Sequence, residues 1–457
     1  MKIAVIGSGL SGLLTSKILL EKNHDVSLID YEQVDKKKIE KFGTISKFKN
    51  ISFKYEDQRF INSNKNFTSL NNVNVENFFL SSVLANGGLS NFWGAGLEIP
   101  DQNYLKNLDY NFDLNRGHKL LNSLFLDNQN NKSLINEYYN DKIVKSLFSN
   151  NKLNIYFTKL KLAFKKNYSG DILNDQVIFE YKDILNLLLG NKKFIFNKSN
   201  FLIDLEKNNE TYNLITKKVL DEKIEKINNF DKVFICAGTI GSTILFNNIL
   251  KLKNFHSKIY HHPMLKLVYF KINNSKINNN FNYPLLNINI KNPQNQEIKG
   301  SVIYLKDVEN KIFGFKNSNK IFNIIKKNFL AGNLFLPSDL VNTEVKFINE
   351  KVYITSKLSS KFLDYRKKIK MKLNRFFREM NYFPIPIQNM QLMEIGSDSH
   401  YTSTLYDKKL FFNKNYELKE FPNVYFMDGS IVPPNLNFPT AFVLMNIDQT
   451  IERIFQK

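Results

Sequence analysis

The chain has 457 residues, of which 43% are hydrophobic and 23% charged, so it can bury a large core and is not a disordered protein. Its length allows roughly two to four domains. Its formal net charge of +21 would suit nucleic acid or an anionic membrane as a partner. Because the lysines are spread along the chain among abundant Asn, Ile and Phe, we interpret the charge as compositional bias and expect no nucleic-acid partner.

The cysteine count and the apolar runs limit the kinds of site and location that we expect. Cys236 is the only cysteine, so neither an internal disulfide framework nor a cysteine metal cluster can form, and we predict no metal site. No hydrophobic stretch approaches the ~20 residues of a membrane span. The chain does not open with the charged leader and apolar segment of a secretory signal, and we therefore expect a cytoplasmic location.

The first thirty residues form a pattern typical of dinucleotide binding. An apolar run from Ile3 to Ile6 predicts a strand, GSGLSG follows as a G-x-G-x-x-G turn, and apolar spacing then predicts a helix. A second predicted strand, Val26 to Ile29, ends at Asp30. Its carboxylate can accept hydrogen bonds from ribose hydroxyls and disfavours a 2′-phosphate, so FAD or NAD fits better than NADP.

The three glycines of this turn have separate expected roles. Gly7 permits the tight turn, Gly9 lets the backbone approach a pyrophosphate, and Gly12 lets the helix pack close to the strand. The N–H groups at the start of the helix then face the phosphates. The cofactor contacts predicted in this region are Gly7, Gly9, Leu10, Ser11, Gly12 and Asp30.

Residues 87–96, GGLSNFWGAG, contain four of the 18 glycines and the only tryptophan of the chain. So much glycine in ten positions indicates either an elaborate turn or a backbone that comes close to a bound molecule. The spacing within the segment does not choose between these two alternatives.

The middle of the chain predicts several elements without a chemical motif of their own. Residues 101–175 have mostly helical and polar patterns, and YKDILNLLLGN predicts a further helix. The stretch FIFNKSNFLIDLEKNNETYNLITKKV predicts a hairpin that turns near Asn208 and Asn209. In FDKVFICAGTIGSTILF, a buried strand over 233–236 precedes a turn of small residues and a helix near 241–245.

Strand-like runs alternate with basic amphipathic segments between residues 264 and 390. A largely antiparallel sheet is predicted by the runs LKLVYFKI, YPLLNINI, GSVIYLK and VKFINEKVYITSK. Two basic amphipathic segments accompany them, KIFNIIKKNFL and DYRKKIKMKLNRFFREM. We expect each segment to pack its apolar face on the sheet, and peripheral association with a membrane surface stays open as the alternative.

The C-terminal block, VYFMDGSIVPPNLNFPTAFVLMNIDQTIERIF, predicts a strand, a loop with prolines and a long final helix. Asp428 stands at the end of the strand. Pro439 has a φ preset for the first position of a helix, and an apolar stripe from Ala441 to Ile454 continues that helix.

In this order, the N-terminal turn, GGLSNFWG, FDKVFICAGTIGSTILF, YHHPML and the C-terminal block resemble the glucose-methanol-choline (GMC) family of FAD-dependent oxidoreductases. The resemblance covers about half of the chain, mainly its FAD-binding segments. It favours a cofactor cradle as the role of residues 87–96. In YHHPML, His262 and Pro263 match the His-Pro step of the family, and we expect a structural role for His262.

The resemblance implies an α/β fold with two parts. A Rossmann-like FAD-binding domain of the two-dinucleotide-binding type would comprise residues 1–100, 176–262 and 396–457. An inserted α+β domain built on an antiparallel sheet would bind the substrate and cap the flavin, and it would comprise residues 101–175 and 263–395.

The resemblance also implies how FAD is held. Phe92 stands where some sugar-oxidising relatives carry a histidine bonded to the flavin, so we expect non-covalent FAD. The start of the final helix would lie at the N1 and C2=O edge of the flavin, where its dipole stabilises negative charge that develops on reduction. Further implied cofactor contacts are Gly87, Gly88, Ser90, Asn91, Trp93, Gly94, Ala237, Gly238, Asp428, Gly429, Pro439 and Thr440.

His400, in GSDSHYTSTL, is the predicted catalytic base. A histidine that is neutral at working pH can take a hydroxyl proton while hydride leaves the carbon. The segment resembles the penultimate motif of the family, which implies Asn437 as the partner that holds the substrate oxygen. Tyr401, Thr402 and Ser403 stand where glycine is more usual, so a structural hydrogen-bonded histidine stays open as the alternative.

The sequence therefore predicts an enzyme, a FAD-dependent oxidoreductase that oxidises an alcohol group of a small molecule such as a sugar or sugar derivative. Oxygen, a quinone and another protein stay open as electron acceptors. The alternatives are a saturase or isomerase on the same fold, a nucleic-acid- or membrane-associated flavoprotein that uses the +21 charge, and a flavin-binding scaffold without catalysis.

Overall fold

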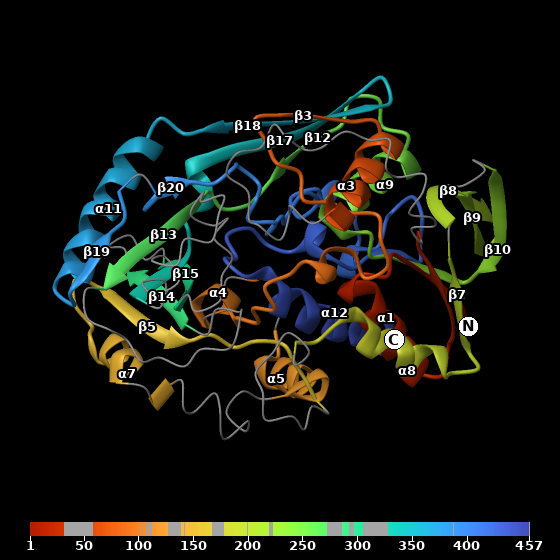
Figure 1. Cartoon of the computed structure of the whole chain (residues 1–457). Helices are drawn as coiled ribbons and strands as arrows, with labels where there is room; N and C mark the ends of the chain where they lie inside the picture. The colour runs from red at the N-terminus through yellow and green to blue at the C-terminus, as the bar shows by residue number, and fades with distance from the viewer. Residues whose placement is uncertain are drawn as a thin grey trace.

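The computed structural model describes residues 1–31, 58–100, 102–106, 108, 112–126, 139–140, 142–166, 178–198, 200–218, 223–271, 286–291, 297–304, 328–386 and 388–456. Figure 1 shows these residues arranged as several sheets with helices between and around them. Two of the sheets, one parallel and one antiparallel, position the site described below.

A parallel sheet brings together strands from distant parts of the chain. In their order across the sheet, the strands are β21 (Val424–Phe426), β11 (Lys232–Ile235), β1 (Lys2–Ile6), β2 (Asp25–Ile29) and β7 (Phe194–Asn197). Every neighbouring pair runs parallel. The chain therefore has a mixed α/β fold that contains a parallel sheet, and this part of the predicted fold class is confirmed.

Apolar residues of the parallel sheet are buried on both of its faces, as is usual for sheets of this kind. Ile3 and Val5 pack in one core cluster, whereas Ala4 and Ile6, which point to the other face, pack in a second. Among the helices that contribute to these clusters are α1 (Leu10–Glu21), α8 (Tyr181–Leu189), α9 (Gly238–Ile249) and α12 (Pro439–Phe455). All four were predicted, although α9 begins three residues before the expected Gly241.

A three-stranded antiparallel sheet follows β7. It consists of β8 (Asn200–Asn208), β9 (Thr211–Lys218) and β10 (Ile224–Phe230). The predicted hairpin and its turn are confirmed, with Asn209 in the left-handed region at φ 55°. The prediction that FIFN begins this hairpin is wrong, because these residues form β7 and pair with β2. Their parallel partner is too distant in the sequence to leave a local pattern.

The largest sheet is antiparallel and lies toward the left of Figure 1. Its strands are β19 (Tyr382–Pro384), β13 (Met264–Lys271), β16 (Phe329–Phe335), β15 (Glu297–Tyr304), β14 (Leu286–Lys291) and β5 (Ile155–Lys159), with β20 (Gln391–Leu392) also beside β13. Every pair in it is antiparallel, which confirms the predicted sheet.

One basic amphipathic segment forms α11 (Phe362–Arg378), which packs on this antiparallel sheet. The rings of Tyr269 and Phe377 stack with their centroids 4.0 Å apart. The predicted packing of its apolar face is therefore confirmed. Of the other segment, KIFNIIKKNFL, residues 320–327 lie outside the described residues, and Phe329 and Leu330 begin β16.

A four-stranded sheet, at the top of Figure 1, was not predicted as a separate unit. It consists of β12 (His256–Ile259), β17 (Val341–Ile348), β18 (Lys351–Leu358) and β3 (Val73–Glu76). The expectation that the hairpin VKFINEKVYITSK belongs to the large antiparallel sheet is wrong. The two strands of this hairpin, β17 and β18, pair instead with β12 and β3. This sheet joins segments that the sequence assigned to two different domains.

The described part of the chain contains further helices, strands and 3-10 turns. They are α3 (Gln58–Leu70), α4 (Gln102–Lys106), α5 (Leu114–Leu124), α7 (Lys142–Ser149), β4 (Phe125–Leu126), β6 (Phe164–Lys165), η2 (Gly88–Asn91), η6 (Ser338–Leu340), η7 (Lys409–Phe411), η8 (Lys414–Tyr416) and η9 (Gly429–Ile431). The mostly helical character expected of residues 101–175 is only partly right, since β5 joins the large sheet.

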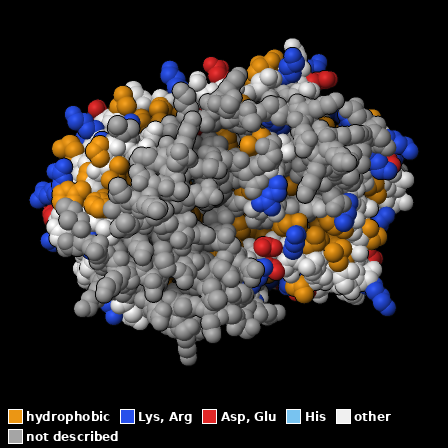
Figure 2. Space-filling view, in the orientation of Figure 1, with side chains coloured by type: hydrophobic (Ala, Val, Ile, Leu, Met, Phe, Trp, Pro, Cys, Tyr) orange, Lys and Arg blue, Asp and Glu red, His pale blue; other side chains and the backbone are white. Residues whose placement is uncertain are grey.

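Lys and Arg side chains are scattered over the described part of the face in Figure 2 and do not gather in one patch. No helix within the described ranges is both long enough and apolar enough to cross a lipid bilayer.

Candidate functional site

A cavity of about 1270 Å³ lies at the carboxyl ends of the parallel strands. Its wall includes Ile6 and Ile29, the last residues of β1 and β2, and Cys236, which follows β11. The opposite wall comes from β13, β15 and β16 of the antiparallel sheet. The volume exceeds the roughly 300–1,000 Å³ of sites for drug-sized ligands, so a dinucleotide and a second molecule can be accommodated.

Most of the predicted site residues meet in this one cavity, although they come from five separated segments. The predicted residues that line it are Gly7, Gly9, Leu10, Ser11, Asp30, Gly87, Gly88, Ser90, Asn91, Trp93, Gly94, Ala237, Gly238, His400, Asp428, Gly429, Pro439 and Thr440. Gly12 and Asn437 do not belong to the lining.

The glycines of the first turn differ in what surrounds them. Gly7 has φ 101°, and a Cβ on Gly12 would overlap the carbonyl oxygen of Gly7. The tight turn and the close packing of helix on strand are therefore confirmed for these two residues. A Cβ on Gly9 would meet no protein atom within 4 Å, because Gly9 opens on the cavity. This position leaves room for a ligand to approach the backbone.

Three helix N-termini open on the cavity without a capping side chain. They belong to α1, α9 and α12, whose N-cap residues are Gly9, Ala237 and Phe438. By contrast, α5 and α8 begin away from the cavity and are capped by Asp113 and Glu180, while α11 has no side-chain cap. The first amides of a helix lack intrahelical acceptors and carry partial positive charge, so the three open ends suit an anionic ligand.

Asp30 is anchored by the glycine turn as well as facing the cavity. Its Oδ2 accepts hydrogen bonds from the backbone N–H (2.7 Å) and the hydroxyl of Ser8, and its Oδ1 accepts one from the N–H of Tyr31 (2.7 Å). A carboxylate offers about four acceptor sites, so capacity for a ribose hydroxyl remains. Burial raises the pKa of Asp30 to about 6.

Ser8 was missed by the sequence reasoning. Its hydroxyl oxygen also accepts a hydrogen bond of 3.0 Å from the N–H of Gly87, so one side chain joins the first turn, the end of β2 and residues 87–96. A hydroxyl residue inside the G-S-G turn was the only sequence feature that could have indicated this role, and its partners Asp30 and Gly87 are distant in the sequence.

Residues 87–96 form a turn that also lines the cavity, and the predicted approach of this backbone to a bound molecule stays a prediction. Gly87 has φ 85°, and a Cβ there would overlap the ring of Tyr181. The fold of the protein therefore requires glycine at this position, whether or not a ligand also approaches it. Ser90 Oγ donates to the carbonyl of Gly87 (2.6 Å), and Asn91 Nδ2 donates to that of Gly88 (3.0 Å).

Asp428 lines the cavity, but its carboxylate is bound to the protein. It accepts hydrogen bonds from the hydroxyl of Ser242 in α9 and from the N–H of Ser430 (2.9 Å). Burial raises its pKa. Asp428 thus ties the end of β21 to α9, and its predicted contact with a cofactor stays a prediction.

His400 lines the cavity between two phenylalanine rings. The centroid of its ring is 4.9 Å from that of Phe335 and 5.4 Å from that of Phe438. The neighbouring Tyr401, one of the residues that stand where glycine is more usual, is buried. Its hydroxyl donates toward the carbonyls of Phe79 (2.7 Å) and Gly396 (2.6 Å). Tyr401 therefore anchors the loop that carries His400.

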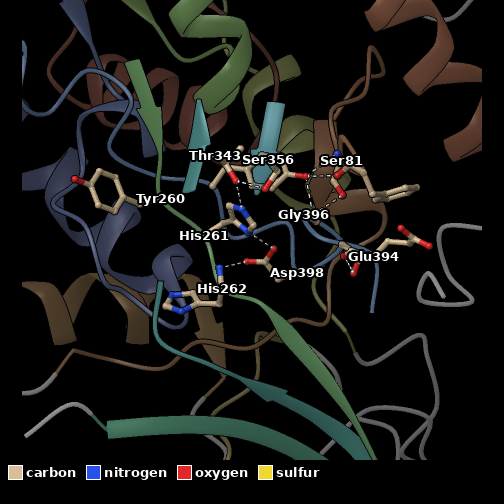
Figure 3. A network of polar contacts seen from close by, with 12 residues as sticks. Ser81, Tyr260, His261, His262, Thr343, Ser356, Glu394, Gly396 and Asp398 are labelled. Carbon is tan, nitrogen blue, oxygen red and sulfur yellow. Dashed lines mark hydrogen bonds and ion pairs between the residues drawn. The ribbon is translucent and has the colours of Figure 1, made fainter. Parts of the chain in front are cut away.

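A buried carboxylate, Asp398, lies beside His261 and His262 (Figure 3). Its Oδ1 is 3.2 Å from Nδ1 of His261, and its Oδ2 accepts from the N–H of His262 (2.9 Å). Burial alone would raise the pKa of Asp398, but it is lowered by His261 and, more weakly, by His400 and His262. The sequence reasoning missed this residue because its partners come from another segment.

His262 has the structural position that was expected. Its ring nitrogens lie 2.8 Å from the carbonyl oxygen of Leu336 and 2.9 Å from that of Leu436, and the side chain is buried. These contacts hold the end of β16 beside the loop that leads to Asn437 and α12. The role proposed for Asn437 stays a prediction.

No protein-family model matches the sequence, and no curated protein sequence matches it either.

Proposed function

We propose that this chain is a FAD-dependent oxidoreductase that oxidises an alcohol group, and that its parallel sheet belongs to a Rossmann-like FAD-binding domain. The observation that carries the proposal is the meeting of the glycine turn, residues 87–96, the start of α9 and the start of α12 around one cavity. The resemblance to GMC oxidoreductases predicted, from sequence motifs, that these segments bind the cofactor. Their convergence in three dimensions supports it.

The residues present fit a dinucleotide. Gly9 presents open backbone to the cavity, and the uncapped starts of α1, α9 and α12 offer N–H groups to phosphate or to an electron-rich ring edge. Residues 9–11 would hold the pyrophosphate and Asp30 a ribose hydroxyl. Pro439 and Thr440, at the start of α12, would face the reactive ring. When bound, FAD would supply the acceptor for hydride from the alcohol carbon.

His400 would take the hydroxyl proton. Among the described residues that line the cavity it is the histidine, and it lies close enough to Asp398 to lower the pKa of that carboxyl group. The rings of Phe335 and Phe438 exclude water beside it and fix its position. A proton accepted at this imidazole would therefore be stabilised without direct contact between Asp398 and the substrate.

The test starts with the purified chain. We expect it to retain a visible flavin spectrum, and we expect a sugar or sugar derivative to bleach that spectrum under anaerobic conditions. A folded protein that is colourless and takes up no added FAD would overturn the proposal. Bound FAD that no alcohol reduces would instead favour a saturase, an isomerase or a scaffold without catalysis.

A further inference from the structure

The antiparallel sheet presents a row of polar side chains to the cavity. Lys266 on β13 lies directly opposite Gln391 on β20 and Asn333 on β16, and Asn333 lies opposite Ser301 on β15. Residues that are directly opposed in an antiparallel sheet share a face, and all four line the cavity. Four strands thus place one ammonium, two amides and one hydroxyl in a line.

The next row on the same face is apolar and reaches His400. Met264 lies two residues before Lys266 and opposite Phe335, whose ring contacts that of His400 at 4.9 Å. Two residues along a strand span roughly 7 Å. The polar row therefore lies about one row beyond the ring that holds the predicted base, which is a distance within the length of a sugar.

Lys266 gives this row its charge. Its side chain is half-buried, and Nζ donates to Oε1 of Gln388 at 3.0 Å. Burial lowers the pKa of Lys266, which shows that the charged form loses hydration here. An ammonium group carries three donors, and a partly desolvated one gains most from an anionic partner.

We propose that the substrate carries an oxyanion, a carboxylate or a phosphate, which Lys266 binds together with Asn333 and Ser301 while the reacting hydroxyl faces His400. This inference rests on the proposed function, since it assigns the substrate class of the same cavity. It makes Lys266 a specificity-determining residue and leaves the proton transfer to His400.

The experiment compares glucose, glucuronate and glucose 6-phosphate as probes of the FAD-loaded protein. Their dissociation constants are measured from the change that each causes in the flavin spectrum and, independently of the flavin, from the rise in melting temperature. We expect at least one of the two anions to bind about tenfold or more tightly than glucose, and the preferred anion distinguishes a carboxylate from a phosphate.

Variants then assign the effect to the side chain. Lys266→Met should weaken binding of the preferred anion by about 10- to 100-fold, the loss expected for a hydrogen bond to a charged group, and should weaken glucose binding much less. Lys266→Arg should restore part of the affinity. Lys372→Met is the matched control, because Lys372 is also partly buried with a lowered pKa but lies on α11, outside the cavity lining.

Two results would overturn the inference while the proposed function stands. One is a FAD-loaded protein that binds neither anion more tightly than glucose. The other is a Lys266→Met protein that binds the anion as well as the wild type. Failure to take up FAD would instead count against the proposed function, and the melting-temperature measurement would still test Lys266.

Discussion

The two ends of the cavity are built from different parts of the polypeptide. At the parallel-sheet end, backbone amides at the starts of α1, α9 and α12 open on the cavity, next to a glycine that presents no side chain and to the carboxylate of Asp30. At the antiparallel-sheet end, they are side chains of Lys266, Asn333 and Ser301. Backbone groups can bind a cofactor whatever side chains the sequence carries there, whereas the side chains at the other end can be replaced, and substrate preference altered, without a change of fold.

This difference implies that substitutions at the two ends have separable effects. A change at the parallel-sheet end should alter cofactor binding or folding, because the backbone atoms of the turn and the helix ends are also the cofactor contacts that we propose. A change at the antiparallel-sheet end should alter substrate binding alone. His400 stands between them and should affect only the reaction rate.

The largest effect is expected for His400→Ala. Removing a general base lowers the rate by about 10²- to 10⁴-fold, so anaerobic flavin reduction should slow by that factor while FAD stays bound. Rapid mixing with the reducing alcohol measures the rate, and His256→Ala, at an exposed histidine that begins β12, is the control. Reduction at the wild-type rate would show that His400 is not the base.

Gly12→Ala and Gly9→Ala form a pair that tests the parallel-sheet end. A methyl group on Gly12 overlaps backbone, so this variant should lose about 1–3 kcal/mol of folding stability or more. A methyl group on Gly9 meets no protein atom, so the apoprotein should melt like the wild type, but FAD should bind at least about tenfold more weakly. Thermal melting and FAD titration separate the two, and unchanged FAD affinity in Gly9→Ala would contradict the assigned cradle.

Asp30 should make folding of the apoprotein depend on pH. Its folded pKa of about 6 lies above the value of an unfolded aspartate, so the folded state binds more protons between about pH 4 and 6. The contribution of Asp30 to stability is present below about pH 4 and is lost as pH rises through 6.

The Asp30→Asn variant has no carboxyl group to titrate at this position. Comparing it with the wild type therefore separates the effect of Asp30 from that of other titrating groups. The wild type should lose on the order of 1–3 kcal/mol relative to this variant between pH 4 and 6.5, measured by urea unfolding of the apoprotein. Parallel stability curves for the two proteins would show that the Asp30 carboxylate titrates normally.

The smallest effect is expected at the antiparallel-sheet end. With a neutral sugar as the probe, Asn333→Ala removes one neutral hydrogen bond of about 0.5–1.5 kcal/mol, so sugar affinity should fall a few-fold while FAD affinity stays the same. Asn289→Ala is the control, because Asn289 belongs to the same sheet but bonds Thr158 and does not line the cavity. A loss of FAD in Asn333→Ala would mean that the two ends are not separable.

The sequence by itself determined the parallel-sheet end of the site. Gly7 adopts a φ of 101° that favours glycine, Gly12 packs against the carbonyl oxygen of Gly7 five residues away, and helix starts are marked by local residues such as Pro439, so short-range patterns were enough to predict them. The same holds for the hairpin of β8 and β9, whose turn and alternation lie in one continuous stretch.

Only the tertiary structure decided which side chains meet. Ser8 reaches Gly87, Asp398 reaches His261, and Lys266 lies opposite Asn333 because strands and loops distant in the sequence are placed together by the packing of whole sheets. The register between two strands follows from burial over their full faces and leaves no mark near any one residue. For the same reason, the parallel pairing of β7 and the separate sheet of β17 and β18 could not be predicted from their own residues.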